Sequence, residues 1–263
     1  MTPLAASNAR VKAARKLSRR SVRTERRLFL ADGPKAVEGA LLADCVQELY
    51  ATPKAAEQYA DLLGPALPTL VDDRAIASLS DSVSPAGVVA VCRRVDQPLD
   101  HALDQALDRG SDLVAICADV RDPGNAGTVI RTADAAGAGA VVLAGHSVDP
   151  YNPKTVRASV GSLFHLPIAV EPDPAAVVRA AQHRGLVVLA ADGAGEVDLF
   201  DADLARPTAW LFGNEAWGLP EELASLADHR IAIPIHGRAE SLNLSTAAAV
   251  CLYTSARALR GRS

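Results

Sequence analysis

The sequence predicts an α/β protein with a parallel sheet, and three observations lead to this prediction. Short apolar runs such as Gly185–Ala191 alternate with helix-forming segments, and such runs are typical of strands buried on both faces of a parallel sheet. Of 263 residues, 49% are hydrophobic and 22% charged, which suits a globular protein of one or two domains with a sizeable core. Polar clusters follow three of the expected strands, where α/β sheets bind ligands.

Composition also indicates a compartment. No apolar run approaches the ~18 residues that a membrane span needs, and the first nine residues lack a basic segment followed by an apolar core. We therefore expect no secretory signal, no membrane partner and a cytoplasmic protein. The cysteines and histidines show no metal-ligand spacing, which favours reduced core thiols and no metal site. The cysteines are Cys45, Cys92, Cys117 and Cys251.

A basic segment opens the chain. Between Arg10 and Arg27 there are nine Lys and Arg and one acid, Glu25, a net +8 in a chain of net −4, so the remaining residues sum to −12. Spacings of three and four predict one helix with one basic face that binds RNA phosphates. A solvated helix that keeps the protein soluble is the alternative. The candidate RNA-binding residues of this face are Lys12, Arg15, Lys16, Arg19 and Arg23. Residues 1–9 are expected to fray.

The basic arm, residues 1–27, precedes a predicted α/β domain at 28–94. Strands are expected at 29–31, 46–51, 69–71 and 86–93. Helices are expected from the Asp32-Gly-Pro34 cap to about Leu42, after Pro53, and near 75–79. An α/β appendage with a purely structural role remains the alternative.

Residues 95–111 are predicted to form a linker and a helix, and residues 112–263 a second domain. The helix is expected at about 100–109, after a linker at 94–99 that contains Asp96 and Pro98. Strands of the parallel sheet are expected at 113–120, 140–145, 166–170, 186–191, 208–213 and 230–235.

Three strand ends in this domain carry polar clusters. After the first strand, Asp122-Pro-Gly124 leads into a helix with Asn125 near its start and Arg131 about two turns in. A second cluster follows the strand that ends in Gly213-Asn-Glu215, before a helix that begins near Pro220. The third is Ser241-Leu-Asn243, before a helix whose expected N-cap is Ser245. All three are candidates for one site.

In this order, the motifs resemble the three signatures of the SpoU/TrmH group of SPOUT RNA methyltransferases. They are Asn125 to Arg131, Phe-Gly-Asn-Glu-Ala-Trp-Gly at 212–218, and Ile-Pro-Ile through Ser-Leu-Asn-Leu-Ser at 233–245. The resemblance covers about residues 110–260 and implies a deep C-terminal trefoil knot, a homodimer, S-adenosylmethionine as methyl donor and an RNA ribose 2′-hydroxyl as acceptor. Residues 28–93 resemble the L30e-like substrate-binding domain that many such enzymes carry.

The two-domain layout and the basic arm favour ribosomal RNA (23S), with the thiostrepton-resistance branch as the first expectation. A tRNA 2′-O-ribose methyltransferase and a non-catalytic knotted RNA-binding or ribosome-assembly protein are the alternatives. A dehydrogenase is disfavoured because Gly137-Ala-Gly lacks the third glycine of a dinucleotide fingerprint. A hydrolase is disfavoured because no nucleophile elbow surrounds Ser241.

The resemblance also implies roles for individual residues. Main chain at Gly213, Ile233 and Leu242 would hold the donor, in a pocket lined by Leu189, Ala190, Asp192 and Leu211; a side chain at position 213 would block the donor's approach. Arg131 would position the ribose and polarise its hydroxyl, Asn125 would fix the loop or the ribose, and Ser241 and Asn243 would orient the reactants. Glu215 would support neighbouring loops, or alternatively cap the helix at Pro220. Lys154 and Arg157 match a basic helix near the family's site, with plain surface charge as the alternative.

Overall fold

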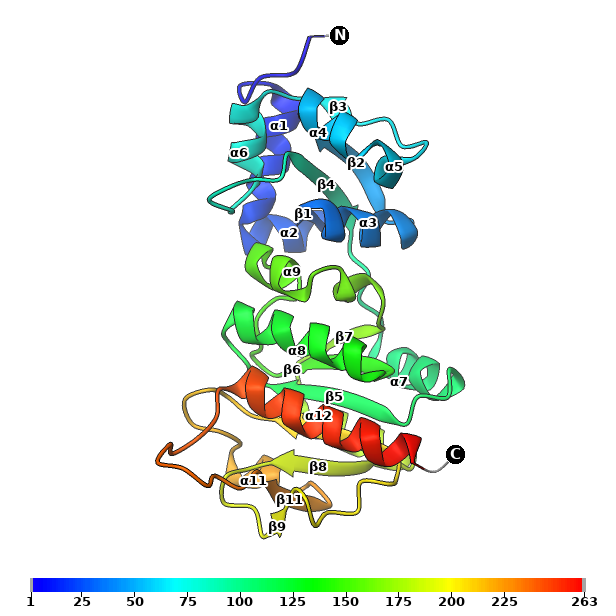
Figure 1. The fold of residues 1–263 in the computed structure, drawn as a ribbon, viewed down its shortest axis with the longest axis vertical. Coiled ribbons are helices and arrows are strands. Elements are labelled where there is room, and N and C mark those ends of the chain that lie inside the picture. Colours follow the sequence, from blue (N-terminus) through cyan, green and yellow to red (C-terminus); the bar gives the residue numbers. More distant parts are fainter. Residues whose placement is uncertain (1, 262–263) are drawn as a thin grey trace. The chain divides into compact units, whose positions relative to one another are not determined.

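A computed structural model describes residues 2–261 and divides into two compact units. Unit 1 contains the chain up to Val95 together with Asp149–His165, and unit 2 contains Asp96–Val148 together with the chain from Leu166 onward (Figure 1). The first boundary lies beside the one expected at residue 94. The segment Asp149–His165 differs from the expected division at 112–263, because it packs with unit 1.

Unit 1 is built on a mixed sheet of four strands in the order β1-β4-β2-β3, in which β4 is antiparallel to both neighbours and β3 is parallel to β2. The strands are β1 Leu28–Asp32, β2 Val46–Ala51, β3 Thr69–Leu70 and β4 Val88–Arg93. The helices are α1 Ala9–Arg15, α2 Arg20–Arg26, α3 Pro34–Leu42, α4 Pro53–Gln58, α5 Ala60–Leu63, α6 Asp73–Leu79 and α9 Pro153–Ser159, with 3₁₀ turns η1 Lys16–Ser18 and η2 Ser162–Phe164.

The N-terminal segment corrects two expectations. Residues near Leu4 do not fray, because the Leu4 N–H donates to the Leu70 carbonyl at 2.8 Å and the Asp72 N–H donates to the Leu4 carbonyl at 3.0 Å. The single basic helix is also wrong: Arg19 has extended backbone (φ −90°, ψ 130°) and separates α2 from α1 and η1. Apolar residues at a spacing of three face inward, and Val11 and Leu17 are at most 1% exposed. The segment is therefore part of the unit's core rather than an arm.

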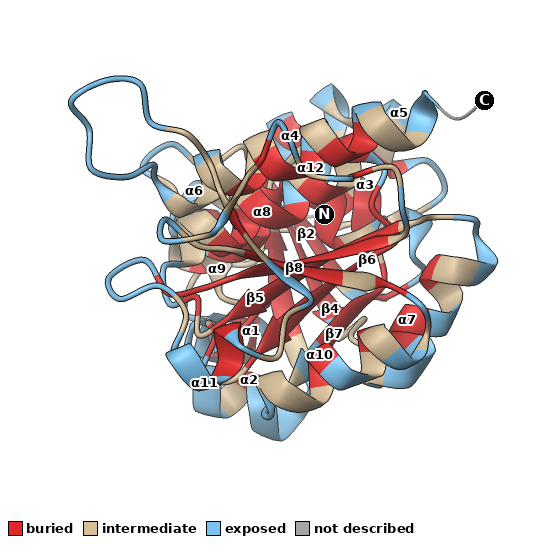
Figure 2. Ribbon diagram, turned by 90° about the horizontal axis from the view of Figure 1, so that it is seen from below, coloured by how far each residue is buried: buried red, intermediate tan, exposed pale blue. Residues whose placement is uncertain are grey.

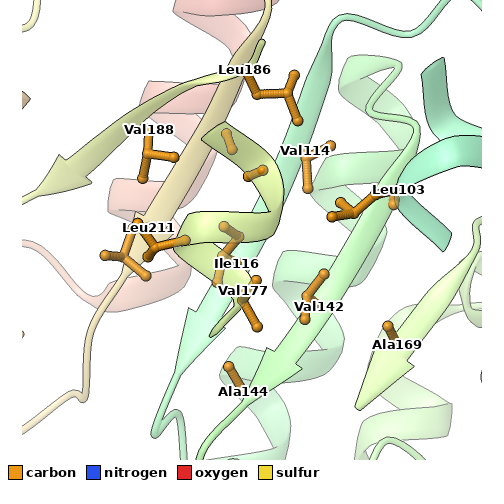
Figure 3. Packing of buried hydrophobic residues seen from close by; sticks show 14 of the residues in the cluster. Leu103, Val114, Ile116, Val142, Ala144, Ala169, Val177, Leu186, Val188 and Leu211 are labelled. Atoms are coloured by element: carbon orange, nitrogen blue, oxygen red, sulfur yellow. The ribbon is translucent and has the colours of Figure 1, made fainter. Parts of the chain in front are cut away.

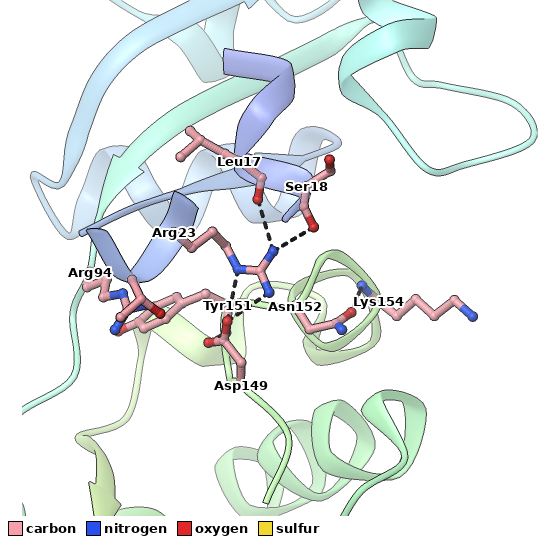
Figure 4. Close-up of polar contacts among 9 residues, drawn as sticks. Leu17, Ser18, Arg23, Arg94, Asp149, Tyr151, Asn152 and Lys154 are labelled. Atoms are coloured by element: carbon pink, nitrogen blue, oxygen red, sulfur yellow. Dashed lines mark hydrogen bonds and ion pairs between the residues drawn. The ribbon is translucent and has the colours of Figure 1, made fainter. Parts of the chain in front are cut away.

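A buried ion pair joins this N-terminal segment to Asp149 (Figure 4). Arg23 and Asp149 have side chains only 2% and 7% exposed, and the Arg23 Nη2 to Asp149 Oδ2 distance is 2.8 Å. The remaining Arg23 donors are used as well: Nε donates to Asp149 at 2.9 Å, and Nη1 donates to the carbonyls of Leu17 and Ser18 at 2.9 and 2.8 Å. The prediction that Arg23 binds RNA phosphate is therefore wrong, because its guanidinium is buried and its hydrogen bonds are satisfied.

Unit 2 contains a sheet of seven strands in the order β7-β6-β5-β10-β8-β11-β9, and every pairing is parallel. This confirms the predicted α/β fold with a parallel sheet. The strands are β5 Leu113–Ala118, β6 Ala140–Ala144, β7 Ile168–Glu171, β8 Val187–Ala191, β9 Val197–Asp198, β10 Thr208–Phe212 and β11 His229–Ala232. The short edge strand β9 was not predicted. The helices are α7 Leu99–Asp108, α8 Pro123–Ala136, α10 Pro174–His183, α11 Glu221–Ala224 and α12 Leu244–Arg260.

Helices cover both faces of this sheet. Helices α8 and α12 lie side by side on one face, while α7, α10 and α11 lie on the other, with red buried strands between them (Figure 2). Leu103 of α7 and Val177 of α10 pack onto Val114, Ile116 and neighbouring strand residues (Figure 3). Double coverage explains why the strands read as continuous apolar runs. No helix within residues 2–261 has the length and apolar character needed to cross a membrane.

Candidate active site

The three polar clusters of unit 2 follow β5, β10 and β11 at the carboxyl end of the sheet. The structure joins them through side chains: Asn125 Nδ2 donates to Glu215 Oε1 at 3.2 Å, and Asn243 Nδ2 donates to Asn125 Oδ1 at 3.1 Å. Asn125 thus bonds to two residues that lie 90 and 118 positions away in sequence, and it uses both atoms of its amide to do so. We refer to Glu215, Asn125 and Asn243 as the loop network.

Glu215 anchors the loop network at the start of α8. Its carboxylate accepts the backbone N–H groups of Arg121 at 3.3 Å and Asp122 at 3.1 Å, in addition to the Asn125 amide. Negative charge is favourable at this end of a helix, where backbone N–H groups lack partners. Of the two predicted roles, the support of neighbouring loops agrees with these contacts. The cap at Pro220 does not, because Glu215 bonds to the start of α8 instead of α11.

Asn243 begins α12 and corrects the predicted N-cap. Its Oδ1 accepts the N–H of Ser245 at 2.9 Å and that of Thr246 at 3.4 Å. Ser245, the expected cap, is the second residue of the helix and donates its hydroxyl to the same Oδ1 at 2.7 Å. Asn is as good an N-cap as Ser, and here the Asn side chain also reaches Asn125, which the shorter Ser does not do.

A cavity of about 350 Å³ opens between these loops. Its walls include four of the residues predicted to hold the donor, namely Asp192, Gly213, Ile233 and Leu242, and also Glu215 and Ser241. The other three predicted lining residues, Leu189, Ala190 and Leu211, are at most 2% exposed and do not line it. They lie in the middle of β8 and β10, where helices cover both faces of the sheet. The other lining residues are Ala191, Gly193, Phe212, Asn214, Ala216, Gly218, Ile231, Ile235, Glu240, Leu244 and Ala247.

Gly213 is required for a different reason from the one predicted. A Cβ at this position would lie 2.4 Å from the Gly218 carbonyl carbon and 2.6 Å from the Leu219 nitrogen, both backbone atoms. The absence of a side chain therefore lets the turn at 214–218 fold back onto the end of β10. Close approach of a ligand is not needed to explain this glycine.

Asn214 is a structural residue that the sequence reasoning passed over. It is 6% exposed, its Nδ2 donates to the Asp119 carbonyl at 2.7 Å, and its Oδ1 accepts the Ala216 N–H at 2.8 Å. Asp119 has a positive φ of 55°, which is uncommon outside glycine, and Asn214 holds that strained loop against β10. The sequence signal that could have identified this role is an amide side chain directly after a buried strand and a glycine.

Arg131 and Ser241 lie outside the loop network. Arg131 is exposed on α8 and has no hydrogen-bond or ion-pair partner among residues 2–261. It follows Asn125 by six residues, which places it roughly 9 Å further along the helix and about 120° around it. Ser241 is exposed at the cavity wall. The structure therefore brings together three of the five predicted catalytic residues.

Cys117 lies near the end of β5, close to the same loops, but it is not a candidate nucleophile. Complete burial, followed by the charge of Glu215, raises the pKa of its thiol to about 12, so the thiol stays protonated near neutral pH. All four cysteines of the chain are buried with free thiols. Within residues 2–261, no group of three or more His, Cys, Asp and Glu side chains is arranged to hold a metal ion.

The remaining predicted RNA-binding residues lie on the surface of unit 1. Lys12, Arg15 and Lys16 are exposed on the N-terminal helices, and Arg19, the extended residue between η1 and α2, is exposed as well. Lys154 and Arg157 are exposed on α9, where Arg157 forms an ion pair with Asp81. That pairing partly neutralises Arg157, whereas the four N-terminal cations have no acidic partner within the described residues.

Comparisons with known proteins agree with this arrangement. Residues 112–253 match the SpoU rRNA Methylase family and residues 8–90 match the MRM3-like substrate binding domain. A 23S rRNA (guanosine(2553)-2′-O)-methyltransferase from Bacillus subtilis is 31% identical over 94% of this chain and 96% of its own length. A 23S rRNA (uridine(2479)-2′-O)-methyltransferase from Streptomyces viridochromogenes is 39% identical over 66% of this chain and 61% of its own length.

A solved structure resembles this protein over nearly all of the chain. The crystal structure of an AdoMet-bound rRNA methyltransferase from Sinorhizobium meliloti has 37% sequence identity and a TM-score of 0.83, and the match covers 96% of both chains. The match to the family covers more than half of this chain, and it includes all three polar clusters of the site. The chain therefore belongs to the SpoU rRNA methylase family.

Proposed function

We propose that this protein is a cytoplasmic enzyme that transfers a methyl group from S-adenosylmethionine to the 2′-hydroxyl of a ribose in ribosomal RNA, with 23S RNA as the first candidate. The observation that carries the proposal is the loop network of Glu215, Asn125 and Asn243 beside a cavity of about 350 Å³. Relatives named as 23S rRNA 2′-O-methyltransferases and an AdoMet-bound structural neighbour support the acceptor and the donor.

The cavity suits S-adenosylmethionine in size and chemistry. Small-molecule sites usually have volumes of roughly 300–1,000 Å³ and mostly apolar walls with a few polar groups. Phe212, Ile231 and Ile233 supply apolar walls, and a Cβ at Gly193 would meet open space, which leaves room for a ligand. Asp192 and Glu240 add carboxylates that are able to accept hydrogen bonds from ribose hydroxyls or from an ammonium group.

The residues of the site act mainly by alignment. S-adenosylmethionine supplies an activated methyl group, and the protein must hold the ribose oxygen in line with it. Fixing two reactants in this way supplies a large part of a rate acceleration. The loop network keeps the Asn125 side chain in one orientation next to Glu215, which lines the cavity together with Ser241. Arg131, which has no protein partner, is free to bind an RNA phosphate and polarise the hydroxyl.

A homodimer and a deep trefoil knot, which the family resemblance implies, are part of this proposal. Helices α8 and α12 lie side by side and carry Arg131 and the 53% exposed Tyr253 on their surface. An exposed aromatic on a helix rich in small residues suits contact with a second copy. For the knot, the support is that three segments far apart in sequence, within 191–193, 212–218 and 231–247, each contribute residues to the wall of the same cavity. The L30e-like character of unit 1 also stays a proposal.

Glu215→Ala is expected to lower the rate of methyl transfer by about 10- to 100-fold. The change leaves three donors, the N–H groups of Arg121 and Asp122 and the Asn125 amide, without a charged acceptor worth about 1.5–3 kcal/mol per bond. Single-turnover transfer at saturating donor measures the effect. Glu222→Ala, which removes an exposed carboxylate from α11, is the control. A Glu215→Ala rate equal to that of the control would remove the loop network from the mechanism.

Replacing Lys12, Arg15, Lys16 and Arg19 by Gln is expected to weaken RNA binding and to make it less sensitive to salt. Each cation that neutralises a phosphate contributes about 0.7 to 0.9 to the slope of log K against log salt, so the slope should fall by up to about three. Titrations at four salt concentrations measure it. A control with four other exposed cations replaced, Lys54, Arg109, Arg179 and Arg206, should keep the slope. An equal fall in both variants would mean that the N-terminal cations act only through net charge.

Transfer of labelled methyl from S-adenosylmethionine tests the function. Ribosomal RNA, total tRNA and ribosomal particles from a host that lacks this protein serve as separate substrates, and the products are hydrolysed with alkali. Label in alkali-resistant dinucleotides from ribosomal RNA is the expected result, because a methylated 2′-oxygen blocks cleavage. Label in tRNA would make tRNA the substrate in place of ribosomal RNA. Label outside the ribose would contradict the proposed 2′-O-methylation. No label in any substrate, with donor and RNA both bound, would favour the assembly protein.

A further inference from the structure

Trp217 is an exposed aromatic beside the donor cavity. It is 55% exposed, whereas the other tryptophan, Trp210, is completely buried and donates its indole N–H to Ser255. Fully burying a large apolar side chain stabilises a protein by roughly 1.5–3 kcal/mol, so leaving Trp217 in solvent forgoes that gain. Tryptophan is enriched at binding surfaces because its ring offers a large apolar face and a polar N–H, so an exposed tryptophan next to a ligand site is a candidate binding residue.

Arg121 lies against this ring. Its guanidinium carbon is 5.1 Å from the ring centroid of Trp217, within the range of a cation–π contact. Arg121 is exposed, and within residues 2–261 its side chain has no carboxylate partner. The pair therefore combines a flat aromatic surface with a positive charge that the protein does not neutralise.

Both side chains are fixed by the backbone that shapes the site. Trp217 lies in a tight turn closed by reciprocal 2.9 Å backbone hydrogen bonds between Asn214 and Gly218. The Arg121 N–H donates to Glu215, the anchor of the loop network. The neighbours of Trp217 on both sides, Ala216 and Gly218, line the donor cavity, while Trp217 itself does not. The ring is thus held at the edge of the cavity on its solvent side.

We propose that Trp217 and Arg121 form a stacking platform for an unpaired base of the RNA substrate, the base of the methylated nucleotide or of its immediate neighbour. Bases in single-stranded RNA stack on aromatic rings and on arginine guanidinium planes, and this contact tolerates any base because each has a π face. The charge of Arg121 is available to the adjoining phosphate. The inference rests on the proposed function, since it assigns the acceptor's base to the outer edge of the same cavity.

The platform predicts a loss of RNA affinity without a loss of donor affinity. Stacking contributes about 1–3 kcal/mol per base, so Trp217→Ala should raise the Kd for RNA by about 5- to 150-fold while the Kd for S-adenosylmethionine changes less than twofold. Trp217→Phe retains an aromatic face and should recover most of the affinity. Arg121→Gln should weaken binding and also reduce its salt dependence. Phe200→Ala, which removes a 64% exposed aromatic that does not line the cavity, is the matched control.

Direct binding separates this inference from the proposed function. An unstructured RNA oligonucleotide is titrated into wild type and Trp217→Phe while tryptophan fluorescence is followed. Quenching in the wild type that disappears in Trp217→Phe supports the platform even if the wild type transfers no methyl group. For an RNA that is methylated, removing the stacked base should weaken wild-type binding but leave Trp217→Ala binding unchanged.

Three results would overturn the platform. If Trp217→Ala bound RNA as tightly as the control Phe200→Ala, this would show that no base stacks on Trp217. A raised Kd for S-adenosylmethionine with unchanged RNA binding would make Trp217 a cover for the donor. A changed sedimentation coefficient in Trp217→Ala would make the ring a contact between copies of the chain.

Discussion

Arg131→Ala is expected to lower methyl transfer by about 100- to 10,000-fold, the range that a group assisting proton transfer contributes. The Kd for S-adenosylmethionine should stay unchanged, because Arg131 does not line the donor cavity. No hydrogen bond or ion pair to residues 2–261 is lost with its guanidinium, so the fold should be unaffected. Transfer at saturating RNA and donor, together with calorimetric donor binding, separates the rate from the affinities.

Two further variants sharpen the test of Arg131. Arg131→Lys keeps a positive charge but loses the planar fork that binds phosphate with two hydrogen bonds, so only a partial recovery is expected. Arg179→Ala removes an exposed arginine from α10, on the opposite face of the sheet, and should transfer at the wild-type rate. Turnover by Arg131→Ala within a few-fold of this control would exclude Arg131 from the reaction.

The positions of the strands were predictable because their signals are local. The expected strand at 46–51 agrees with β2, and those at 140–145 and 208–213 differ from β6 and β10 by one residue at the end. The last two runs belong to the parallel sheet and consist mostly of Val, Ala, Leu and aromatic residues, as buried parallel strands do, whereas 46–51 also contains Gln47 and Glu48. The short strand β9 was missed because its two residues, Val197 and Asp198, are too few to show a pattern of apolar residues.

The polar network of the site was only partly predictable. Sequence order identified Asn125, Glu215 and Asn243, and strand topology explains why they meet at one end of the sheet. Which atom bonds to which residue depends on loop conformation, and so Asn243 rather than Ser245 caps α12, and Glu215 accepts the Asp122 N–H at the start of α8. Leu189, Ala190 and Leu211 do not line the cavity for a related reason: they lie within β8 and β10, where helices cover both faces of the sheet.

The sequence-based predictions failed most clearly where the role of a residue depends on a partner far away in the sequence. The spacing of Arg23 matches that of the other residues of the basic face, and no neighbouring residue in the sequence indicates that Arg23 is buried while Arg19 is exposed. Its partner, Asp149, lies 126 residues away in a segment that seemed to belong to the second domain. The spacing of Val11, Ala14 and Leu17, an apolar stripe on the same segment, was the available sign that these helices have a buried side.

Arg23→Met is expected to destabilise unit 1 by about 3–5 kcal/mol, because it leaves the 7% exposed Asp149 carboxylate buried without its counter-charge. Asp149→Asn should cost less, although it leaves the Arg23 charge buried, because Arg23 still donates to the carbonyls of Leu17 and Ser18 and the Asn amide oxygen is able to accept the Tyr151 N–H. The double variant should be more stable than Arg23→Met, because no buried charge remains. The free energy of unfolding of unit 1 in urea, followed by hydrogen exchange in α2 and α9, measures all three.

Arg10→Ala is the control for Arg23→Met, because it breaks an ion pair of the same charge type that is exposed instead of buried. Arg10 also pairs with a carboxylate, that of Glu48 at 3.4 Å, but the two side chains are 53% and 38% exposed. Water already solvates both groups, so breaking this pair should cost less than about 1 kcal/mol. If Arg23→Met were equally mild, water would have to reach Asp149 in the variant, and the pair would not hold Asp149–His165 on unit 1. If the large cost appears and the double variant removes most of it, this segment and the N-terminal helices fold as one cooperative body, which gives the proposed RNA-binding cations a rigid support.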